Sequence, residues 1–442
     1  MLPHSSLPTL HSLLPTPHLP RGNLALNILG LLVSTCLITQ GFATAADAAN
    51  PEHLKQLLDT KACPKCDLRD AQLMDANLQE ANLSGAKLDG AHLKGANLTR
   101  ANLQGAELRG VQLSAANLKG ANLRQAKLGV KQQNTEMVVS DLQDANLQEA
   151  DLSAADLTRA QLTHANLGEA KLNYATLPAA NLEKANLIRA NFASANLAGA
   201  NLKEAQLKIA NLTGANLTGA QMSGANLDSA NADGANLSGA DLRQANLNEA
   251  DFNNAVLKAA KLQNGVLISA NLRSADLSSA DLGAANMKGA GLNRANLSAA
   301  NLERADLTNA KLAIANLTEA KLTGAKLHFA YLHSANLTKA NLNGVDLRQA
   351  QLRSADLTSA TLIGATLESA NLITAQLTGA NLTYTNLKLC DFRGANLTGA
   401  NLSYANLSQA DLGLASLLDA NLRGANLSDA KLKGVIGLNR SN

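Results

Sequence analysis

From Asp141 to Leu432 the chain repeats one five-residue pattern of apolar and polar positions without a break in phase. The typical unit reads Ala, then Asn or Asp, then Leu, then two variable and mostly polar residues. A period of five fits neither the 3.6-residue period of an amphipathic helix nor the alternation of an ordinary strand. Ala and Leu stand two apart, so an extended backbone points both to the same side. We therefore expect a chain that turns after every unit and keeps each Ala/Leu pair facing one axis.

The same repeat covers an earlier stretch that is separated from the long one by an interruption. The spacing from Leu128 to Leu142 is 14 residues, which is not a multiple of five. The sequence therefore predicts a short stack over residues 66–128, an interrupting loop over 129–140, a long stack over 141–434, and a C-terminal cap or tail over 435–442.

The interruption itself contains one clue to where the repeat resumes. Met137 lies five residues before Leu142, so we expect the register to resume at Thr135 with Met137 facing inward. The segment Gly129–Asn134 then forms a bulged loop or a kink. It is either a tolerated insertion or a binding protrusion, since loops on rigid scaffolds often carry contacts.

The N-terminal residues 1–45 have the order of an export signal. Arg21 is the first basic residue, an apolar run follows from Leu24 to Ile38, and Ala43–Ala45 provides a small-residue cleavage site. The apolar run is shorter than the roughly 20 residues of a membrane span. We therefore expect a cleaved signal and no stable membrane insertion after cleavage, with an uncleaved anchor or a chance apolar segment as the alternatives.

Residues 46–65 are expected to form a linker and a short helical cap. The segment Asn50–Glu52 has the features of a helix start, namely a side-chain acceptor, a proline in the first turn and an acidic residue near the positive end of the helix dipole. Leu54, Leu57 and Leu58 fall on one helical face. Such a helix would cover the first coil of the repeat, whose backbone edge and core would otherwise be exposed.

Cys63 and Cys66 form a C-x-x-C motif directly after this segment. Three interpretations remain open: a structural disulfide, two unpaired thiols packed at the first coil, and redox or metal chemistry. A zinc site would require a second pair of ligands at matching spacing, which the sequence lacks.

The Ala-(Asn/Asp)-Leu-x-x unit over residues 66–434 closely resembles the motif of the pentapeptide-repeat family. This resemblance implies an all-β fold, a right-handed quadrilateral β-helix with four units in each coil, here with the short N-terminal α-helical cap. A minority of the family mimics DNA and binds topoisomerases. Exported cyanobacterial members imply the periplasm or the thylakoid lumen as the location.

Substitutions at the inward positions agree with a coil of four units. The inward Leu is replaced by Phe192, Phe252 and Phe392, and by Ala232, at positions that differ by multiples of 20. We expect these residues to lie on one side of the core, with the Phe252 ring leaning into the space that Ala232 leaves. Cys390 takes an Ala position and is interpreted as a small buried residue.

Aromatic side chains outside the core are rare and mark candidate contacts. Exposed aromatic residues are enriched at protein interfaces, although an incidental surface position is the alternative. Tyr384 and Tyr404 stand one coil apart and should stack. The predicted partner patch consists of His328, Phe329, Tyr331, His333, Tyr384 and Tyr404.

Composition narrows the function further. The 38 basic and 35 acidic residues give a net charge of +3, which favours neither nucleic-acid binding nor an acidic imitation of DNA. Carboxylates are scattered over convex faces, and no catalytic, cofactor-binding or metal-binding constellation stands out. We therefore expect no catalytic residues, no cofactor and no metal.

The sequence thus favours an exported, non-enzymatic rod with a structural or protein-interaction role. Its protein partner is not identified by the pattern, and homo-oligomerisation is compatible with it. A DNA-mimicking topoisomerase binder and a thiol redox protein acting through Cys63 and Cys66 are the alternatives.

Overall fold

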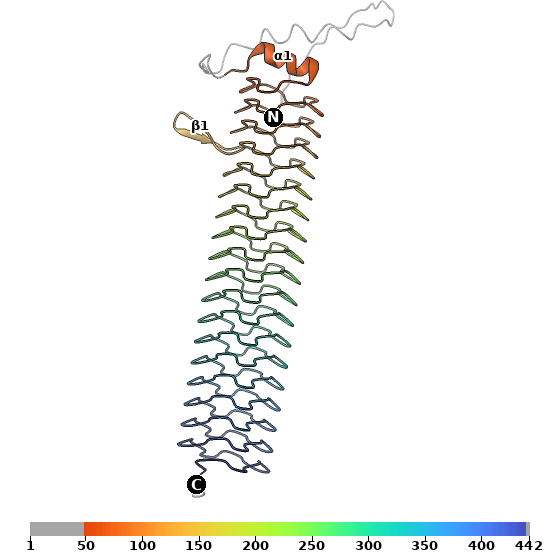
Figure 1. The fold of residues 1–442 in the computed structure, drawn as a ribbon. Coiled ribbons are helices and arrows are strands. Elements are labelled where there is room, and N and C mark those ends of the chain that lie inside the picture. The colour runs from red at the N-terminus through yellow and green to blue at the C-terminus, as the bar shows by residue number, and fades with distance from the viewer. Residues whose placement is uncertain (1–47, 439–442) are drawn as a thin grey trace, which may run out of the picture. The chain divides into compact units, whose positions relative to one another are not determined.

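The computed structural model describes residues 48–438, all of which belong to one compact unit, Asp47–Asn442 (Figure 1). The predicted export signal, residues 1–45, lies outside the described residues. Helix α1 spans Pro51–Thr60, and a stack of short coils follows it. The only strands of two or more residues in the described part are β1, Lys131–Gln133, and β2, Glu136–Val138. No helix of this part is long and apolar enough to cross a membrane.

The coils pair with one another through single-residue parallel bridges. In the long repeat each bridge joins residues 20 apart, as between Lys311 and Tyr331. The N–H of Leu307 donates to the carbonyl of Lys326 in the next coil at 2.7 Å. Backbone hydrogen bonds therefore run between coils and satisfy the buried amides. The bridges confirm that four five-residue units make one coil of a parallel β-helix.

A tight turn closes each unit and produces the corner of the coil. At one such corner the N–H of Ala310 donates to the carbonyl of Leu307 at 2.9 Å, and Asn309 takes a φ of 60°. A positive φ at the third residue is the mark of a type II turn. Glycine suits this position, but side chains as bulky as those of Ile314 and Phe329 also occupy it. The corner geometry is thus imposed by the coil as a whole.

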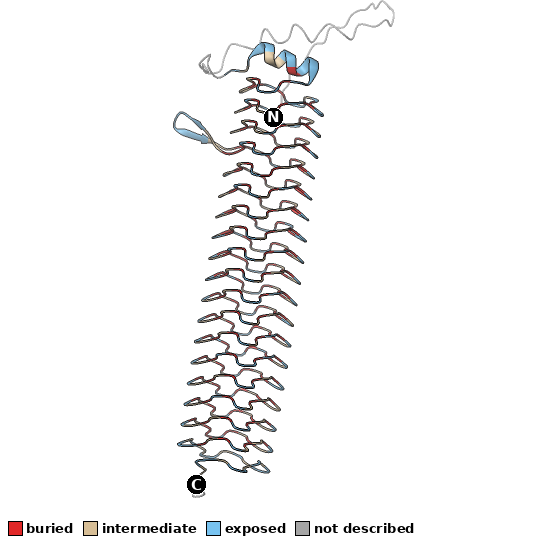
Figure 2. Ribbon diagram, viewed as in Figure 1, coloured by how far each residue is buried: buried red, intermediate tan, exposed pale blue. Residues whose placement is uncertain are grey.

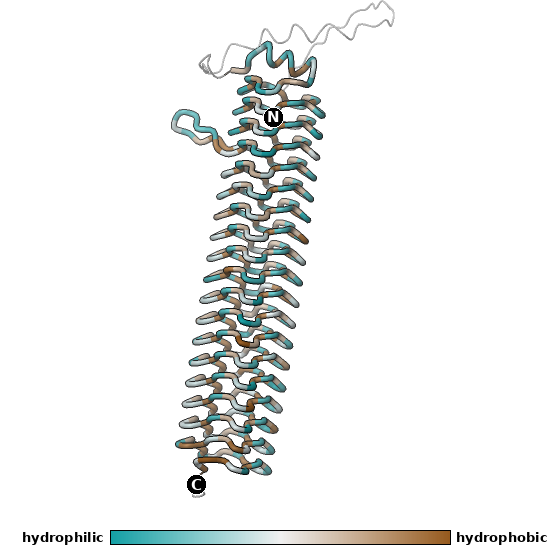
Figure 3. The backbone as a smooth tube through the Cα atoms, viewed as in Figure 1, coloured by the Kyte–Doolittle hydropathy of each residue, from teal (hydrophilic) through white to brown (hydrophobic). Residues whose placement is uncertain are grey.

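The core is a narrow column of leucine and alanine side chains. Along the coils, buried residues alternate with exposed ones in Figure 2, and hydrophobic residues with hydrophilic ones in Figure 3. Phe192, Phe252, Phe392 and Ala232 are all fully buried, which confirms their predicted inward orientation. Burial of this apolar surface is the main force that holds the coils together.

The hydrogen bonds made by the second residue of the unit explain why Asn and Asp recur at that position. The Oδ1 atom of Asn316 accepts the N–H of Thr318 at 3.1 Å within its own unit. Its Nδ2 donates to Asn296 in the neighbouring coil at 3.2 Å. An Asn or Asp side chain readily bonds its own backbone two residues on. The same side chain therefore fixes the turn and links consecutive coils.

The stack is longer and more continuous than the sequence predicts. Bridges begin at Ala62, before the expected start at residue 66, and continue to Ile436, beyond the expected end at 434. Gln112 pairs directly with Asp141 across the interruption. The predicted short and long stacks are therefore one stack.

The interruption forms a β-hairpin that projects from the side of the coils (Figure 1). The expected resumption at Thr135 is wrong, because Met137 belongs to β2 and is 59% exposed. Ser140 instead fills the Ala position, fully buried, and its single O–H is shared between the Leu108 and Gly129 carbonyl oxygens, which lie 2.9 and 3.1 Å from its Oγ. This hydrogen bonding makes a buried serine acceptable where the repeat normally has alanine.

The two ends of the described stack differ. Helix α1 closes the first coil, with Asn50 accepting the N–H of Glu52 at 2.9 Å as its N-cap. Leu57 is fully buried, whereas Leu58 is 55% exposed and does not share the covered face as predicted. Leu54 is partly buried and packs against the core as predicted. The helix therefore docks through the arc that carries His53, Leu57 and Leu54, and at 100° per residue Leu58 lies about 40° beyond Leu54, outside that arc. At the other end, inward side chains are only partly buried, namely those of Leu422, Leu427 and Leu432.

Candidate functional site

The hairpin is fixed to the side of the stack by one long side chain. The Nζ of Lys131 lies 2.9 Å from the Asp70 carboxylate, although 61 residues separate the two. Lys131 crosses two corners that are occupied by glycine. A Cβ atom at Gly110 would lie 2.9 Å from the Cβ of Lys131, and one at Gly90 would lie 2.6 Å from its Nζ. Glycine at these two corners therefore leaves the room that the lysine needs.

A hollow of about 360 Å³ lies between the hairpin and the coils. Its lining mixes basic, amide, hydroxyl, thioether and aliphatic groups with the carboxylate of Asp70, which is paired with Lys131, and the Met74 side chain is 58% exposed. The polar part of the lining includes His92, Lys94, Gln112, Ser114 and Gln133. The mixture suits contact with another molecule better than it suits acid–base chemistry, which requires desolvated and matched ionisable groups.

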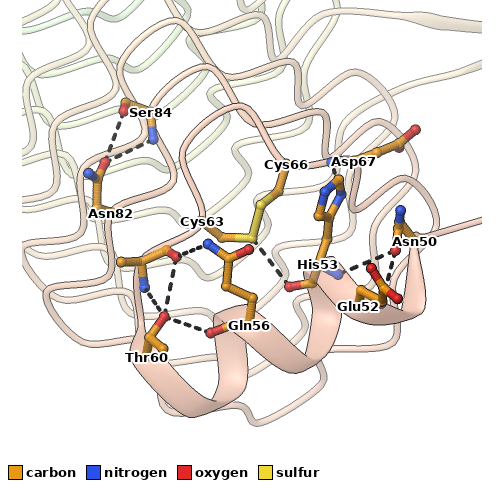
Figure 4. The surroundings of a disulfide bond; sticks show 11 residues. Asn50, Glu52, His53, Gln56, Thr60, Cys63, Cys66, Asp67, Asn82 and Ser84 are labelled. Atoms are coloured by element: carbon orange, nitrogen blue, oxygen red, sulfur yellow. Dashed lines mark hydrogen bonds between the residues drawn. A yellow bond between two sulfur atoms is a disulfide. The ribbon is translucent and has the colours of Figure 1, made fainter.

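Cys63 and Cys66 form a disulfide beneath α1 (Figure 4). Cys63 takes the Leu position of one unit and Cys66 the Ala position of the next, so the disulfide spans one corner of the first coil. The two residues are 0% and 4% exposed. The His53 carbonyl oxygen lies 3.2 Å from the Cys63 sulfur, and the His53 ring accepts the N–H of Asp67 at 3.0 Å. The disulfide is therefore shielded from an external thiol in the folded protein.

The predicted partner patch divides into separate groups. His328 and Phe329 share a corner, with ring centroids 3.9 Å apart. Tyr331 and His333 lie on the adjoining side of the same coil, and both are exposed. Among the described residues, neither ring stacks on the His328–Phe329 pair. Phe329 and Tyr331 are 44% and 48% exposed, so both offer apolar surface to a partner.

Tyr384 and Tyr404 form the second group, at a different corner of the coil. Their rings stack as predicted, with centroids 5.1 Å apart and planes within 9° of each other. The two side chains are 63% and 46% exposed. Offset stacking of this kind stabilises a pair of exposed rings in a fixed orientation.

Arginine pairs neutralise several carboxylates within their own units. In the Asp-Leu-Arg unit at Asp241, the Arg243 guanidinium donates to both carboxylate oxygens, at 2.8 and 2.6 Å. These hydrogen bonds lower the pKa of Asp241 against the opposing effect of burial. Arg348 lowers the pKa of Asp346 in the same way. A carboxylate held ionised by arginine is a poor general acid or base near neutral pH.

Cys390 is buried and chemically quiet, as expected for a residue in an Ala position. Its thiol donates to the Leu367 carbonyl at 2.9 Å. Burial raises the pKa of this thiol to about 12. Because the thiolate is the reactive form of cysteine, Cys390 is unsuited to nucleophilic chemistry. Within residues 48–438, no three or more His, Cys, Asp or Glu side chains gather as a metal site.

A second hollow, of about 450 Å³, was not predicted from the sequence. It lies where Gly291 takes the place of the usual Asn or Asp, so this unit has no side chain at the position that is normally polar. Gly291 is the only glycine at that position of the repeat from Asp67 to Ile436, and this is the signal that could have revealed the hollow. The surrounding side chains are those of Ser269, Asn271, Arg273, Asn293 and Lys311.

Comparisons with known proteins bear on the repeat rather than on these sites. The family model described as pentapeptide repeats matches residues 66–129, 140–177, 179–208, 210–372 and 375–436. No curated protein matches the chain.

Several solved structures are similar to parts of the chain. HetL, a pentapeptide repeat protein involved in heterocyst differentiation regulation in the cyanobacterium Nostoc, is 37% identical over 50% of this chain and 88% of its own, with a TM-score of 0.36. A pentapeptide repeat protein of the Arabidopsis thaliana thylakoid lumen is 34% identical over 23% of this chain and 70% of its own, with a TM-score of 0.23. QnrB1, a plasmid-mediated fluoroquinolone resistance protein, is 21% identical over 39% of this chain and 82% of its own, with a TM-score of 0.27.

Proposed function

Because this chain belongs to the pentapeptide repeat family, we propose that it is an exported, non-enzymatic scaffold that binds a protein partner through side chains exposed on its coils. The right-handed, four-sided winding of the family is part of the same proposal. The order of residues 1–45 supports export to the periplasm or the thylakoid lumen. Cleavage of the signal after Ala45 would be read directly as the N-terminal sequence of the mature protein.

The observation that carries the proposal is the exposure of Phe329 and Tyr331 on a regular, hydrogen-bonded frame. Large aromatic side chains that remain 44% and 48% exposed have an apolar surface available to a partner. The coils hold these residues in place, because the N–H of Phe329 donates to the Arg348 carbonyl at 3.1 Å and that of Tyr331 to the Ala310 carbonyl at 2.9 Å. A partner would therefore meet a preformed surface.

Neither alternative function has comparable support. A thiol redox role through Cys63 and Cys66 requires an accessible sulfur, whereas both residues are covered. DNA mimicry requires a strongly acidic surface, whereas the chain carries a net charge of +3. Non-enzymatic action agrees with the arginine-paired carboxylate of Asp241 and with the quiet thiol of Cys390.

The proposal is tested by quantitative co-purification from the envelope fraction of the native host. A Phe329→Ser/Tyr331→Ser variant should lose at least nine-tenths of the partner that the unmodified protein retains. The matched control is Tyr174→Ser, which removes another exposed aromatic ring, 66% exposed, from a distant coil. Retention of the partner by the double variant, or equal loss in the control, would overturn the proposal.

A further inference from the structure

We infer that one side of the stack, over the five coils between residues 270 and 354, binds an acidic segment of a protein partner. We call this side the basic face and define it as residues 270–274, 290–294, 310–314, 330–334 and 350–354, which the parallel bridges place directly above one another. The inference rests on the proposed function, because it names the chemistry of the partner that the scaffold would bind.

The basic face differs in charge from every other side of the same coils. It carries four cationic residues and no Asp or Glu: Arg273, Arg294, Lys311 and Arg353. The preceding side, residues 265–269 and its equivalents up to 345–349, has three cationic and two acidic residues. The following side, residues 275–279 up to 355–359, has one cationic and three acidic residues. The remaining side, residues 260–264 and its equivalents up to 340–344, has three cationic and two acidic residues. The near balance of the whole chain therefore conceals one face of a single sign.

The four cations are available to a ligand. All four side chains are exposed. Among the described residues, none of them has a carboxylate partner within ion-pair distance. Some other cations of the stack are paired, as between Lys208 and Asp228 at 2.8 Å. Lys261 and Lys321 are also unpaired, but their side of the coils carries acidic residues as well. Unpaired cations on one surface attract an anionic partner and accelerate its encounter.

The hollow at Gly291 provides an anchoring point on this face. Arg273 and Lys311 belong to its lining from the coils on either side, and the lining also offers the hydroxyl of Ser269 and the amide of Asn293. The amide nitrogen of Asn271 already donates to the Asp251 carboxylate of the preceding coil at 2.8 Å. Its volume of about 450 Å³ exceeds that of a carboxylate side chain. A carboxylate placed there would meet two cations and neutral donors, which is the arrangement that gives charge-assisted hydrogen bonds.

The composition of the face favours an acidic peptide over nucleic acid. Successive bases of a single strand require a series of aromatic platforms, whereas the exposed ring on this face other than histidine is that of Tyr331, on one coil. The exposed Ile314, at 57%, suits an apolar side chain instead. Neighbouring coils lie about 4.8 Å apart and an extended peptide rises about 3.3 Å per residue, so the five coils match roughly six extended residues.

The probe is a fluorescein-labelled deca-glutamate peptide, with deca-lysine and a deca-thymidine oligonucleotide as comparison ligands, measured by fluorescence anisotropy at two salt concentrations. The test variant is Arg273→Glu/Lys311→Glu. The matched control is Lys261→Glu/Lys321→Glu, which makes the same change in net charge on another side of the stack. Equal melting temperatures establish that both variants fold.

We expect the unmodified protein to bind deca-glutamate, the test variant to bind at least tenfold more weakly, and the control to bind within threefold of the unmodified protein. Absence of binding, equal weakening in both variants, or tighter binding of the oligonucleotide would each overturn the inference. The proposed function is read out separately. A native partner that is lost with Phe329→Ser/Tyr331→Ser but retained by Arg273→Glu/Lys311→Glu would leave the scaffold role standing and refute the basic face.

Discussion

The Lys131 ammonium and the Asp70 carboxylate lie 2.9 Å apart across 61 residues of chain. This ion pair connects the base of the hairpin to a coil that lies much earlier in the sequence. The side chain of Lys131 is only 18% exposed, so this pair is more shielded from water than most ion pairs of the stack. The hairpin is therefore a docked structure at its base and an exposed one at its tip.

Replacing Lys131 by Met should release the hairpin without unfolding the stack. We expect amide hydrogen exchange of residues 131–138 to accelerate at least tenfold, while global stability falls by about 1 kcal/mol or less. The control is Lys127→Met, which breaks the 3.0 Å pair with Glu107 at another position. Unchanged exchange in the hairpin would show that the lysine does not fix it.

The inward and outward assignment predicts a sharp contrast between two adjacent residues. Leu322 is fully buried and Thr323 is exposed. Leu322→Asp should destabilise the protein by more than about 4 kcal/mol, because it buries a charge without a partner. Thr323→Asp should change stability by about 0.5 kcal/mol or less. Thermal denaturation of both variants decides the matter, and similar melting temperatures would refute the assignment.

The Cys63–Cys66 disulfide should contribute modestly to stability. Its sulfur atoms close a loop of only a few residues, for which chain entropy predicts about 2 kcal/mol. The variant Cys63→Leu/Cys66→Ala restores the ordinary residues of the repeat and so isolates the covalent bond. We expect a small loss of stability in denaturant titrations and unchanged partner binding. Loss of partner binding in a folded variant would instead point to chemistry at this site.

Cys390 should resist alkylation for as long as the protein is folded. Its pKa of about 12 and its burial leave almost no accessible thiolate at neutral pH. Iodoacetamide labelling, followed by mass spectrometry of the peptide containing Cys390, should appear only above the denaturant concentration that unfolds the stack. Rapid labelling in native buffer would contradict the buried position.

The Asp241–Arg243 pair should make stability depend on pH in the acidic range. The pKa of Asp241 is lower in the folded protein than its ordinary value of about 4. Its contribution is therefore complete above that ordinary value and disappears as the pH falls through the lower folded pKa. Asp241→Asn keeps an acceptor for the Arg243 N–H but loses the charge.

We expect this substitution to cost about 1 kcal/mol at pH 6 and less at pH 2, measured by chemical denaturation. Asp419→Asn, at an exposed corner, serves as the control. A cost for Asp241→Asn that stays constant between the two pH values would exclude the ion pair as its cause.

Much of the fold follows from the five-residue pattern. The repeat alone places Ala and Leu inside, and the spacing of Phe192, Phe252 and Phe392 by multiples of 20 residues indicates the length of the coil. The stacking of Tyr384 on Tyr404 follows from the same spacing. These features depend on one local rule that each coil repeats.

The hairpin could not be placed by that rule. Met137 satisfies the five-residue spacing, but the spacing of one methionine does not outweigh cross-strand pairing over residues 131–138 and the buried hydrogen bonding of the Ser140 hydroxyl. The predicted burial of Leu58 was wrong for a related reason. A helical period identifies an apolar face, whereas the arc that becomes covered depends on how His53 and Leu57 dock.

The charge of the surface shows a different limit. A net charge of +3 is an average over all sides of the stack, and it led us to expect no electrostatic preference. Sorting the charges by their position within the 20-residue coil separates Arg273, Arg294, Lys311 and Arg353 from the acidic residues. The information is present in the sequence, but it is visible only once the register of the coils is known.

The difference between the two ends of the described stack gives the molecule a direction. Leu57 seals one end under α1, whereas Leu422 and Leu427 at the other end remain partly in contact with water. In a repeat protein each coil is stabilised by its neighbours, and loss of an outer coil exposes the next. Unfolding should therefore start at the Ile436 end and proceed coil by coil toward the hairpin. Amide exchange rates should accordingly be highest near Ile436 and decrease along the axis toward α1.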